Sequence, residues 1–159
     1  RKTSCIFLCF SVVWFADAGA GLAPAPGPKI MEHTDKPKAL IVDDSRAVRM
    51  ILARNLRELG YETGEAADGV EALRLLTADP AVFLLALVDW NMPEMNGMEL
   101  LRAVRADASL ARLTVIMVTT ETEIEHMAAA LEAGANEYVM KPFTREILLD
   151  KLQLASLGR

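Results

Sequence analysis

The chain has 159 residues, which suits one domain and is too short for two. Apolar residues make up 52% and charged residues 25%, so the chain can bury a core and is not disordered throughout. The net charge of −5 gives no electrostatic reason to bind nucleic acid, because phosphate binding needs an excess of Lys and Arg. The two cysteines, Cys5 and Cys9, indicate neither a disulfide framework nor a zinc site.

Residues 1–35 differ from the rest of the chain and are kept out of the fold prediction. Two basic residues precede an apolar run at 5–16, and a Gly/Ala/Pro-rich stretch follows it. Three interpretations remain open: an export signal, a membrane-associating tail, or sequence upstream of a natural start at Met31. The apolar run is shorter than the roughly 20 residues that a spanning helix needs, so no membrane span is expected. We expect residues 36–159 to form the domain.

From residue 38 onward, short apolar runs alternate with segments of helical periodicity. Continuous apolar runs of this length are typical of strands that are buried on both faces of a sheet. The strands predicted in this way are 39–42, 84–88, 115–118 and 138–140, with a weaker strand at 62–66.

Helices are predicted between these strands, where apolar residues recur every three or four positions. Gly60 and Gly134 end two of the helices, Asp79-Pro80 ends a third, and Thr144 caps the last. The apolar positions with this spacing are Val48, Ile51, Leu52, Leu56 and Leu59; Val70, Leu73 and Leu76; Met98, Leu101 and Val104; Ile124, Met127 and Leu131; and Leu148, Leu152 and Ala155.

Five strand–helix units in strict alternation predict an α/β fold with a parallel five-stranded sheet covered by helices on both faces. In open sheets of this kind, ligands bind at the carboxyl ends of the strands. We therefore expect the polar side chains that follow four of the strands to converge in one pocket. These residues are Asp43 and Asp44, Asp89, Thr119, and Lys141.

Each of these polar residues also has a simpler explanation when it is considered alone. Asp43-Asp44-Ser45 is a good helix start, Thr119 can be another cap, and Asp89 and Lys141 can belong to turns. Unrelated turns, however, need not place three carboxylates, a hydroxyl and an ammonium at one end of one sheet. The joint pattern therefore favours a functional site.

The chemistry of this set points to phosphoryl transfer. Three close carboxylates repel one another unless a cation intervenes, and oxygen ligands suit Mg²⁺. A lysine beside them can pair with a phosphate oxygen as a compact charge. The set is therefore suited to transferring a phosphoryl group to a carboxylate.

Over about residues 38–157, the sequence resembles the response-regulator receiver domain. The resemblance is carried by Asp43-Asp44, by residues 89–97 (DWNMPEMNG), by Val118-Thr119 and by residues 138–143 (YVMKPF). It implies a flavodoxin-like, doubly wound (βα)5 fold with strand order 2-1-3-4-5. It also implies a cis peptide bond between Lys141 and Pro142.

The same resemblance implies a role for each acidic residue. Asp89 is the expected phosphoacceptor, and Mg²⁺ is the expected cofactor. Asp44, Asp89 and the backbone carbonyl of Asn91 are expected to bind the metal, with Asp43 contributing through water.

Further residues are implied to bind the phosphoryl group and to transmit the signal. Thr119 and Lys141 are expected to contact the phosphoryl group, and Tyr138 matches the aromatic switch position. In the last helix, Ile147, Lys151 and Leu154 form a second stripe, which either widens the buried face or is exposed beside Tyr138. The expected output surface comprises Thr122, Ile124, Tyr138, Lys151 and Leu154.

The implied function is that of a stand-alone response regulator in a two-component phosphorelay, most similar to the chemotaxis-type members. Its expected partners are a sensor histidine kinase or histidine phosphotransfer protein, and a target such as a flagellar motor switch protein or a phosphatase. No nucleic acid is expected as a partner. The protein is expected to be cytoplasmic, to act by docking, and to have no enzymatic activity beyond self-phosphorylation and autodephosphorylation.

Other functions share some of these sequence features. A phosphorelay intermediate that passes the group to a histidine phosphotransfer protein has the same sequence requirements. A Mg²⁺-dependent phosphohydrolase of the haloacid-dehalogenase type needs a second acid where this chain has Asn91. A flavodoxin-like cofactor binder would need a Ser/Thr/Gly-rich phosphate loop after the first strand, and this sequence has none there. The intact set of acidic and basic residues argues against a scaffold that is never phosphorylated.

Overall fold

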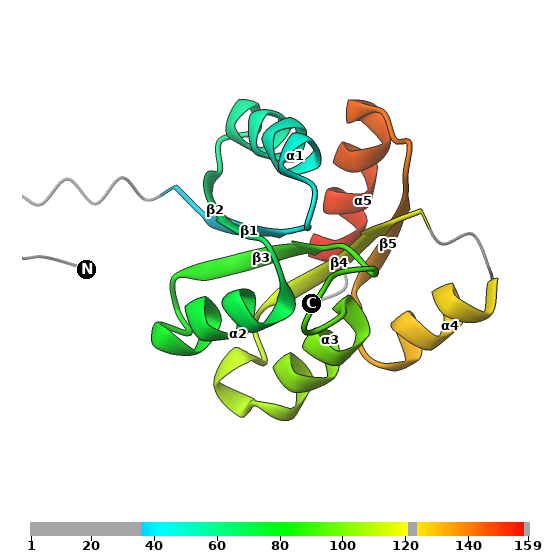
Figure 1. Cartoon of the computed structure of the whole chain (residues 1–159). Helices are drawn as coiled ribbons and strands as arrows, with labels where there is room; N and C mark the ends of the chain where they lie inside the picture. The colour runs from blue at the N-terminus through cyan, green and yellow to red at the C-terminus, as the bar shows by residue number, and fades with distance from the viewer. Residues whose placement is uncertain (1–35, 121–123, 158–159) are drawn as a thin grey trace, which may run out of the picture. The chain divides into compact units, whose positions relative to one another are not determined.

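The computed structural model of the chain describes residues 36–120 and 124–157. Within these residues, strands and helices alternate from one end to the other (Figure 1). The strands are β1 (Lys38–Val42), β2 (Glu62–Ala66), β3 (Phe83–Val88), β4 (Thr114–Thr119) and β5 (Glu137–Met140). The helices are α1 (Arg46–Glu58), α2 (Gly69–Ala78), α3 (Gly97–Ala106), α4 (Ile124–Glu132) and α5 (Arg145–Leu157), with a short 3-10 helix, η1 (Ala108–Leu110), before β4.

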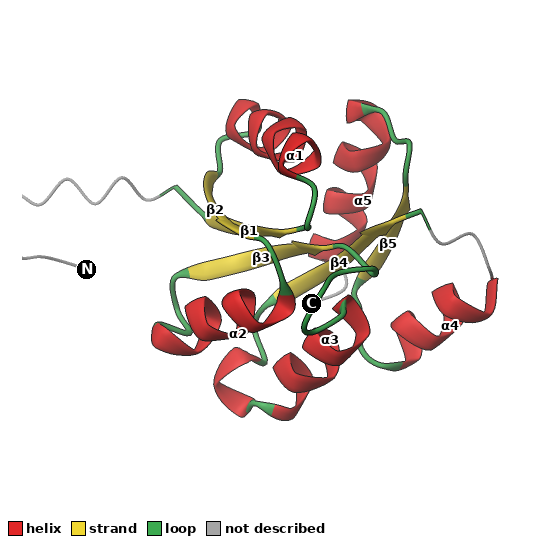
Figure 2. Cartoon of the chain, in the orientation of Figure 1, coloured by secondary structure: helices red, strands yellow, loops and turns green. Residues whose placement is uncertain are grey.

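The five strands form one parallel sheet with the order β2-β1-β3-β4-β5 (Figure 2). Strand β1 pairs with β2 on one side and with β3 on the other. The chain therefore reverses its direction of winding after β2, and the adjacent strands β1 and β3 lead into helices on opposite faces, α1 and α3. This arrangement confirms the predicted flavodoxin-like α/β fold.

Helices cover both faces of the sheet, which explains why the strands are apolar without interruption. Along β1, Leu40 and Val42 face the layer formed by α2, α3 and α4, whereas Ala39 and Ile41 face α1 and α5. All four of these residues are fully buried. Because successive side chains point to opposite faces, a strand covered on both sides cannot show an alternating pattern.

The predicted helix ends are found close to their expected positions. Gly60 and Gly134 follow α1 and α4 with φ angles of +91° and +101°, in the left-handed region that favours glycine. Thr144 precedes α5, and its hydroxyl oxygen accepts a hydrogen bond from the Ile147 N–H at 3.4 Å. These residues stop or start helices because they satisfy backbone groups that the helix itself leaves unpaired.

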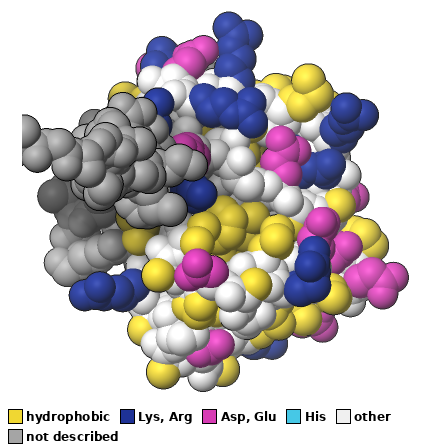
Figure 3. All heavy atoms as spheres, turned by 90° about the vertical axis from the view of Figure 1, so that its left-hand side faces the viewer, with side chains coloured by type: hydrophobic (Ala, Val, Ile, Leu, Met, Phe, Trp, Pro, Cys, Tyr) yellow, Lys and Arg dark blue, Asp and Glu magenta, His cyan; other side chains and the backbone are white. Residues whose placement is uncertain are grey.

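Some apolar residues with helical spacing are exposed instead of buried. Ile51 on α1, Val70 on α2 and Leu131 on α4 are each about half exposed, whereas Ala53, Ala72 and Ala130 are buried on the same helices. Small residues let these helices approach the sheet closely, so larger residues at the margin of the stripe remain outside. Figure 3 shows the side of the molecule that lies to the left in Figure 1, where hydrophobic side chains are exposed among charges of both signs. None of the described helices is long and apolar enough to cross a bilayer.

Candidate functional site

Three residues that directly follow strands meet at the carboxyl edge of the sheet: Asp43 after β1, Asp89 after β3 and Lys141 after β5. Their backbones are still held by neighbouring strands, because the Asp89 N–H donates to the Val42 carbonyl at 2.8 Å and the Lys141 N–H donates to the Thr119 carbonyl at 2.8 Å. The Lys141–Pro142 peptide bond is cis, as expected. Hydrogen bonds to neighbouring strands therefore fix the positions from which these side chains extend.

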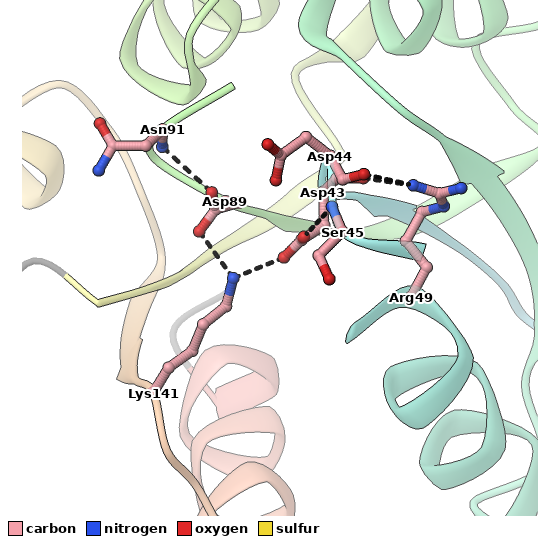
Figure 4. A network of polar contacts seen from close by, with 7 residues as sticks. All are labelled: Asp43, Asp44, Ser45, Arg49, Asp89, Asn91 and Lys141. Atoms are coloured by element: carbon pink, nitrogen blue, oxygen red, sulfur yellow. Dashed lines mark hydrogen bonds and ion pairs between the residues drawn. The ribbon is translucent and has the colours of Figure 1, made fainter. Parts of the chain in front are cut away.

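The ammonium of Lys141 bridges two buried carboxylates (Figure 4). Its Nζ donates to Asp43 Oδ2 at 2.5 Å and to Asp89 Oδ1 at 2.8 Å. The exposed fractions of the three side chains are 14% for Lys141, 2% for Asp43 and 8% for Asp89. Because little water reaches this group, the Coulomb attraction within the two ion pairs is stronger than in surface pairs, and removal of one partner would leave a buried charge unpaired.

The same burial shifts the protonation of the site. Burial raises the pKa of Asp89, and the charge of Asp43 adds to this rise, while the hydrogen bond and charge of Lys141 oppose it without cancelling it. Burial also disfavours the charged form of Lys141, but its hydrogen bonds with both carboxylates and their charges outweigh that effect and raise its pKa. The site therefore combines a firmly charged ammonium with a carboxylate whose negative charge is costly.

The remaining oxygens of the two buried carboxylates accept backbone hydrogen bonds. The Ser45 N–H donates to Asp43 Oδ1 at 2.8 Å, and the Asn91 N–H donates to Asp89 Oδ2 at 3.2 Å. Ser45 occupies the N-cap position of α1, but its own side chain makes no capping hydrogen bond. The helix-start explanation of Asp43-Asp44-Ser45 is therefore incomplete, since the Asp43 carboxylate binds the backbone at this turn.

The acidic residues suit a Mg²⁺ ion. One carboxylate oxygen from each of Asp43, Asp44 and Asp89 lies within 4.8 Å of the others. Asp44 is exposed and its carboxylate has no partner among the described residues, so it can turn toward a cation. An oxygen-only set of carboxylates that is partly open to water is what Mg²⁺ prefers, since this ion keeps several of its waters. Asn91 lies at the rim of the set, with its backbone amide on Asp89.

Gly97 allows the loop after Asp89 to fold closely over the site. Its N–H donates to the Trp90 carbonyl at 2.9 Å, and a Cβ atom at this position would lie 2.1 Å from the Asp89 carbonyl oxygen. Any other residue would displace the backbone that carries Asp89. Just before it, Asn96 and Glu99 form a capping box that starts α3.

Thr119 and Tyr138 lie on the neighbouring strands β4 and β5. Thr119 is fully buried at the end of β4, where its carbonyl receives the Lys141 N–H. Tyr138 is 4% exposed and belongs to the core on the α2, α3 and α4 face. The Tyr138 side chain is thus buried in this structure and lies beneath the expected output surface instead of being exposed on it.

The other expected output residues are only partly described. Thr122 lies outside the described residues, and Ile124 begins α4, although its side chain also lies outside the description. On α5, Leu154 is 52% exposed and Ile147 is 46% exposed. Between them, Lys151 Nζ pairs with Glu137 Oε2 of β5 at 2.7 Å. The second stripe of α5 is therefore exposed, and its lysine is paired with β5.

Arg49 of α1 is a contact of the site that the sequence patterns did not single out. Its Nη1 donates to the backbone carbonyls of Asp43 at 2.7 Å and Asp44 at 3.3 Å. The only sequence signal was a cation in the first turn of a helix, where positive charge is unfavourable.

Comparisons with known proteins agree with this geometry. The family model for the response regulator receiver domain matches residues 39–153. The chemotaxis protein CheY of Pseudomonas aeruginosa is 48% identical over 117 residues, which cover 73% of this chain and 93% of that protein. The chemotaxis protein CheY1 of Helicobacter pylori is 45% identical over 118 residues, which cover 74% of this chain and 94% of that protein.

A solved structure is also similar over most of its length. The crystallised chemotaxis protein CheY4 of Vibrio cholerae superimposes with a TM-score of 0.68 at 39% identity, covering 74% of this chain and 97% of that one. The sheet order, the residues at its carboxyl edge and these similarities lead to one conclusion. The chain belongs to the response regulator receiver domain family.

Proposed function

We propose that this protein is a phosphorylation-controlled switch of a two-component system. In this proposal, Asp89 accepts a phosphoryl group from a histidine kinase or histidine phosphotransfer protein, and the surface formed by α4, β5 and α5 then binds a target protein. One observation carries the proposal: the Asp89 carboxylate lies 2.8 Å from the Lys141 ammonium, with carboxylate oxygens of Asp43 and Asp44 within 4.8 Å. An isolated structural aspartate needs no such surroundings.

The transfer itself requires little of the protein beyond orientation and charge. An oxygen of Asp89 attacks phosphorus, the bond from phosphorus to the donor imidazole breaks, and the imidazole nitrogen keeps the electron pair. The product is an acyl phosphate on Asp89. Lys141 is already held beside Asp89, so its ammonium can pair with a phosphoryl oxygen without a large movement.

The proposed reaction uses Mg²⁺ as its cofactor. Asp44, Asp89 and the Asn91 carbonyl would hold the ion, with Asp43 contributing through water. When bound, Mg²⁺ supplies positive charge that neutralises the oxygens of the transferred group. Lys141 and Mg²⁺ would then share the charge of the acidic set, whereas Lys141 is the cation that pairs with Asp43 and Asp89 in the structure.

The proposed output depends on Thr119 and Tyr138. We infer that the Thr119 hydroxyl moves toward the phosphoryl oxygens and leaves space that the Tyr138 ring can occupy. Such an element has two arrangements, and a bias of about 1.4 kcal/mol changes their ratio tenfold. The exposed Ile147 and Leu154 on α5 lie on the surface that would change, which suits contact with an amphipathic helix of the target.

The biological role proposed here is chemotaxis. Relatives named as chemotaxis proteins are 45% and 48% identical to this chain over most of their length. By this likeness, the target would be a flagellar motor switch protein, the location would be the cytoplasm, and no catalysis beyond self-phosphorylation and autodephosphorylation would be involved.

The decisive experiment is incubation with Mg²⁺ and acetyl phosphate, followed by intact-mass measurement within the first minutes. We expect a mass increase of one phosphoryl group, which disappears after hydroxylamine treatment because an acyl phosphate is cleaved by it. Asp89→Asn should show no increase, and omission of Mg²⁺ should abolish labelling. Asp150→Asn, which changes an exposed aspartate of α5, is the matched control and should be labelled like the wild type.

Two results would contradict the proposal. Labelling of Asp89→Asn at the wild-type level would show that another residue is the acceptor. Steady multiple turnover of acetyl phosphate with no covalent product, at rates that Asp89→Asn retains, would indicate a different phosphate chemistry.

A further inference from the structure

Arg49 holds the backbone that carries the two adjacent acidic residues. Its Nη1 donates to the carbonyl oxygens of both Asp43 and Asp44, at 2.7 and 3.3 Å (Figure 4). Its Nε donates to Glu65 Oε2 at 3.2 Å. The Arg49 side chain is only 15% exposed, although it belongs to a surface helix. One guanidinium therefore ties the turn before α1 to strand β2.

The position of Arg49 is electrostatically unfavourable for the helix. It lies in the first turn of α1, where the backbone N–H groups give the helix a positive end, and this turn contains no acidic residue. A cation at this position should destabilise the helix unless its contacts offset the repulsion. The observed contacts are with the turn that bears the candidate metal ligands, so they can offset this repulsion and stabilise the turn.

We propose that Arg49 is a positioning residue of the metal site, and this inference rests on the proposed Mg²⁺ function. By donating hydrogen bonds to both carbonyl groups, Arg49 fixes the two peptide planes of the turn. The orientation of these planes determines where the carboxylates of Asp43 and Asp44 point. The contacts of Arg49 in this turn are with main-chain oxygens, so it would act through the backbone.

Glu65 completes the arrangement from β2. Its carboxylate binds the Nε of Arg49, which leaves Nη1 directed at the carbonyl groups. In addition, Glu65 partly neutralises the guanidinium, which would otherwise repel a nearby metal ion. The effect of Glu65 on metal binding should therefore pass through Arg49.

Charge and geometry make opposite predictions for substitutions of Arg49. If only its charge matters, Arg49→Ala removes a cation near a cation site, so Mg²⁺ should bind more tightly. Arg49→Lys keeps the charge and should then change nothing. If Arg49 positions the turn, both substitutions should weaken Mg²⁺ binding, because a lysine cannot span the two carbonyls and Glu65 with a planar fork.

The test measures the Mg²⁺ dissociation constant by isothermal titration calorimetry and by Trp90 emission in a Trp14→Phe background. We expect Arg49→Lys and Arg49→Ala each to raise the constant by about tenfold, the size typical of residues that orient metal ligands. Arg46→Ala and Arg54→Ala remove exposed cations from the same helix and are the matched controls. Both controls should leave the constant unchanged or slightly lower.

A second measurement does not depend on metal. The Ser45 N–H donates to Asp43 Oδ1, so its hydrogen exchange reports whether the turn keeps its shape. In the metal-free protein, Arg49→Lys should accelerate exchange of this amide, whereas Arg54→Ala should not. Glu65→Gln should weaken Mg²⁺ binding in the wild-type background but have no further effect when Arg49 is already alanine.

The outcomes separate the inference from the function on which it rests. Unchanged or tighter Mg²⁺ binding in Arg49→Lys, or unchanged Ser45 exchange, would overturn the role of Arg49 while leaving the proposed function intact. If the wild-type protein itself binds no Mg²⁺, the proposed function is wrong, and the Ser45 exchange alone then decides whether Arg49 holds the turn. Should Arg49→Ala fold poorly, Arg49→Lys still decides, since it preserves the charge and most of the side chain.

Discussion

The indole ring of Trp90 and the imidazole ring of His126 are stacked, with centroids 5.1 Å apart and planes inclined by 23°. Trp90 directly follows Asp89, and His126 lies in the first turn of α4. This contact therefore joins the loop of the proposed phosphoacceptor to a helix of the proposed output surface. It also gives a spectroscopic probe of their relative position.

Loss of the His126 ring should be visible in Trp90 fluorescence. In a Trp14→Phe background, we expect His126→Ala to shift the Trp90 emission to longer wavelength, because the indole gains contact with water. An aromatic pair adds about 0.5–1.5 kcal/mol to stability, so the free energy of unfolding in urea should fall by an amount of this order. His126→Phe keeps a ring and should preserve both properties; if it behaves like alanine, the stack is not the cause.

Asp89→Asn should stabilise the metal-free protein at neutral pH. Since burial raises the pKa of Asp89, the unfolded chain loses this proton at a lower pH than the folded chain. Stability therefore falls as the pH rises from the ordinary aspartate pKa, about 4, through the higher pKa of the folded state. Each tenfold difference in proton affinity between the two states corresponds to about 1.4 kcal/mol.

Asparagine does not titrate, so Asp89→Asn should remove this fall in stability with rising pH. Urea unfolding at several pH values between acid and neutral conditions measures the effect, with Asp150→Asn as an exposed control. A less stable Asp89→Asn at neutral pH would mean that the ion pair with Lys141 outweighs burial.

Lys141→Met should destabilise the fold strongly. It removes the cation from two buried carboxylates, and breaking a buried pair in this way costs about 3–5 kcal/mol. Because the folded state raises the Lys141 pKa, the stabilisation from its charge is complete below the pKa of an unfolded lysine and is lost only in the alkaline range.

The destabilisation caused by Lys141→Met should therefore be large at neutral pH and smaller in acid, where Asp89 becomes protonated. Lys38→Met removes an exposed lysine that pairs with Glu62, and it should cost less than about 1 kcal/mol. Equal effects of the two substitutions would show that the buried pairs contribute little.

Asp44→Ala should weaken Mg²⁺ binding far more than it affects folding. Asp44 is the exposed member of the acidic cluster and its carboxylate has no partner among the described residues, so its loss breaks no side-chain contact within this part of the metal-free protein. We expect an affinity loss of at least about tenfold by calorimetry. Asp150→Ala is the control, and an Mg²⁺ affinity in Asp44→Ala equal to that of this control would remove Asp44 from the ligand set.

Leu154→Glu should abolish binding to the target or self-association in the presence of a beryllofluoride mimic of the phosphoryl group. Leu154 is 52% exposed on α5, so the substitution should leave the fold and Mg²⁺ binding unchanged. Val70→Glu is a close control, because Val70 is also 52% exposed but lies on α2, on the other face of the sheet. Full association of Leu154→Glu would place the output elsewhere.

The sequence predicted the fold well because buried parallel strands leave a simple signal. Even the weak strand, predicted around residues 62–66, is found at Glu62–Ala66, after the helix that Gly60 ends. Helix faces were less certain: Val70 and Leu131 have helical spacing yet are exposed, whereas Ala72 and Ala130 on the same helices are buried. Spacing alone does not reveal how near a helix lies to its sheet.

The residues of the candidate site could be predicted from the ends of the strands, but the contacts that support them could not. Asp43, Asp89 and Lys141 were expected together because parallel strands end at the same edge, and the structure brings them into hydrogen-bond contact. Arg49 was missed because its partners in the turn are backbone carbonyls, which carry no residue-specific signal. In a helix rich in arginine, such a residue is indistinguishable from a solvated charge.

The cluster of three carboxylates with one ammonium limits how the proposed switch can operate. Together these groups leave two negative charges, so one divalent ion brings the pocket to neutrality. Conversion of one carboxylate to an acyl phosphate replaces a single negative charge with roughly two. The two signalling states would then differ by about one elementary charge inside a pocket that is otherwise balanced. Because Coulomb interaction falls with distance, this added charge acts most strongly on the groups in direct contact with Asp89, of which Lys141 at 2.8 Å is one.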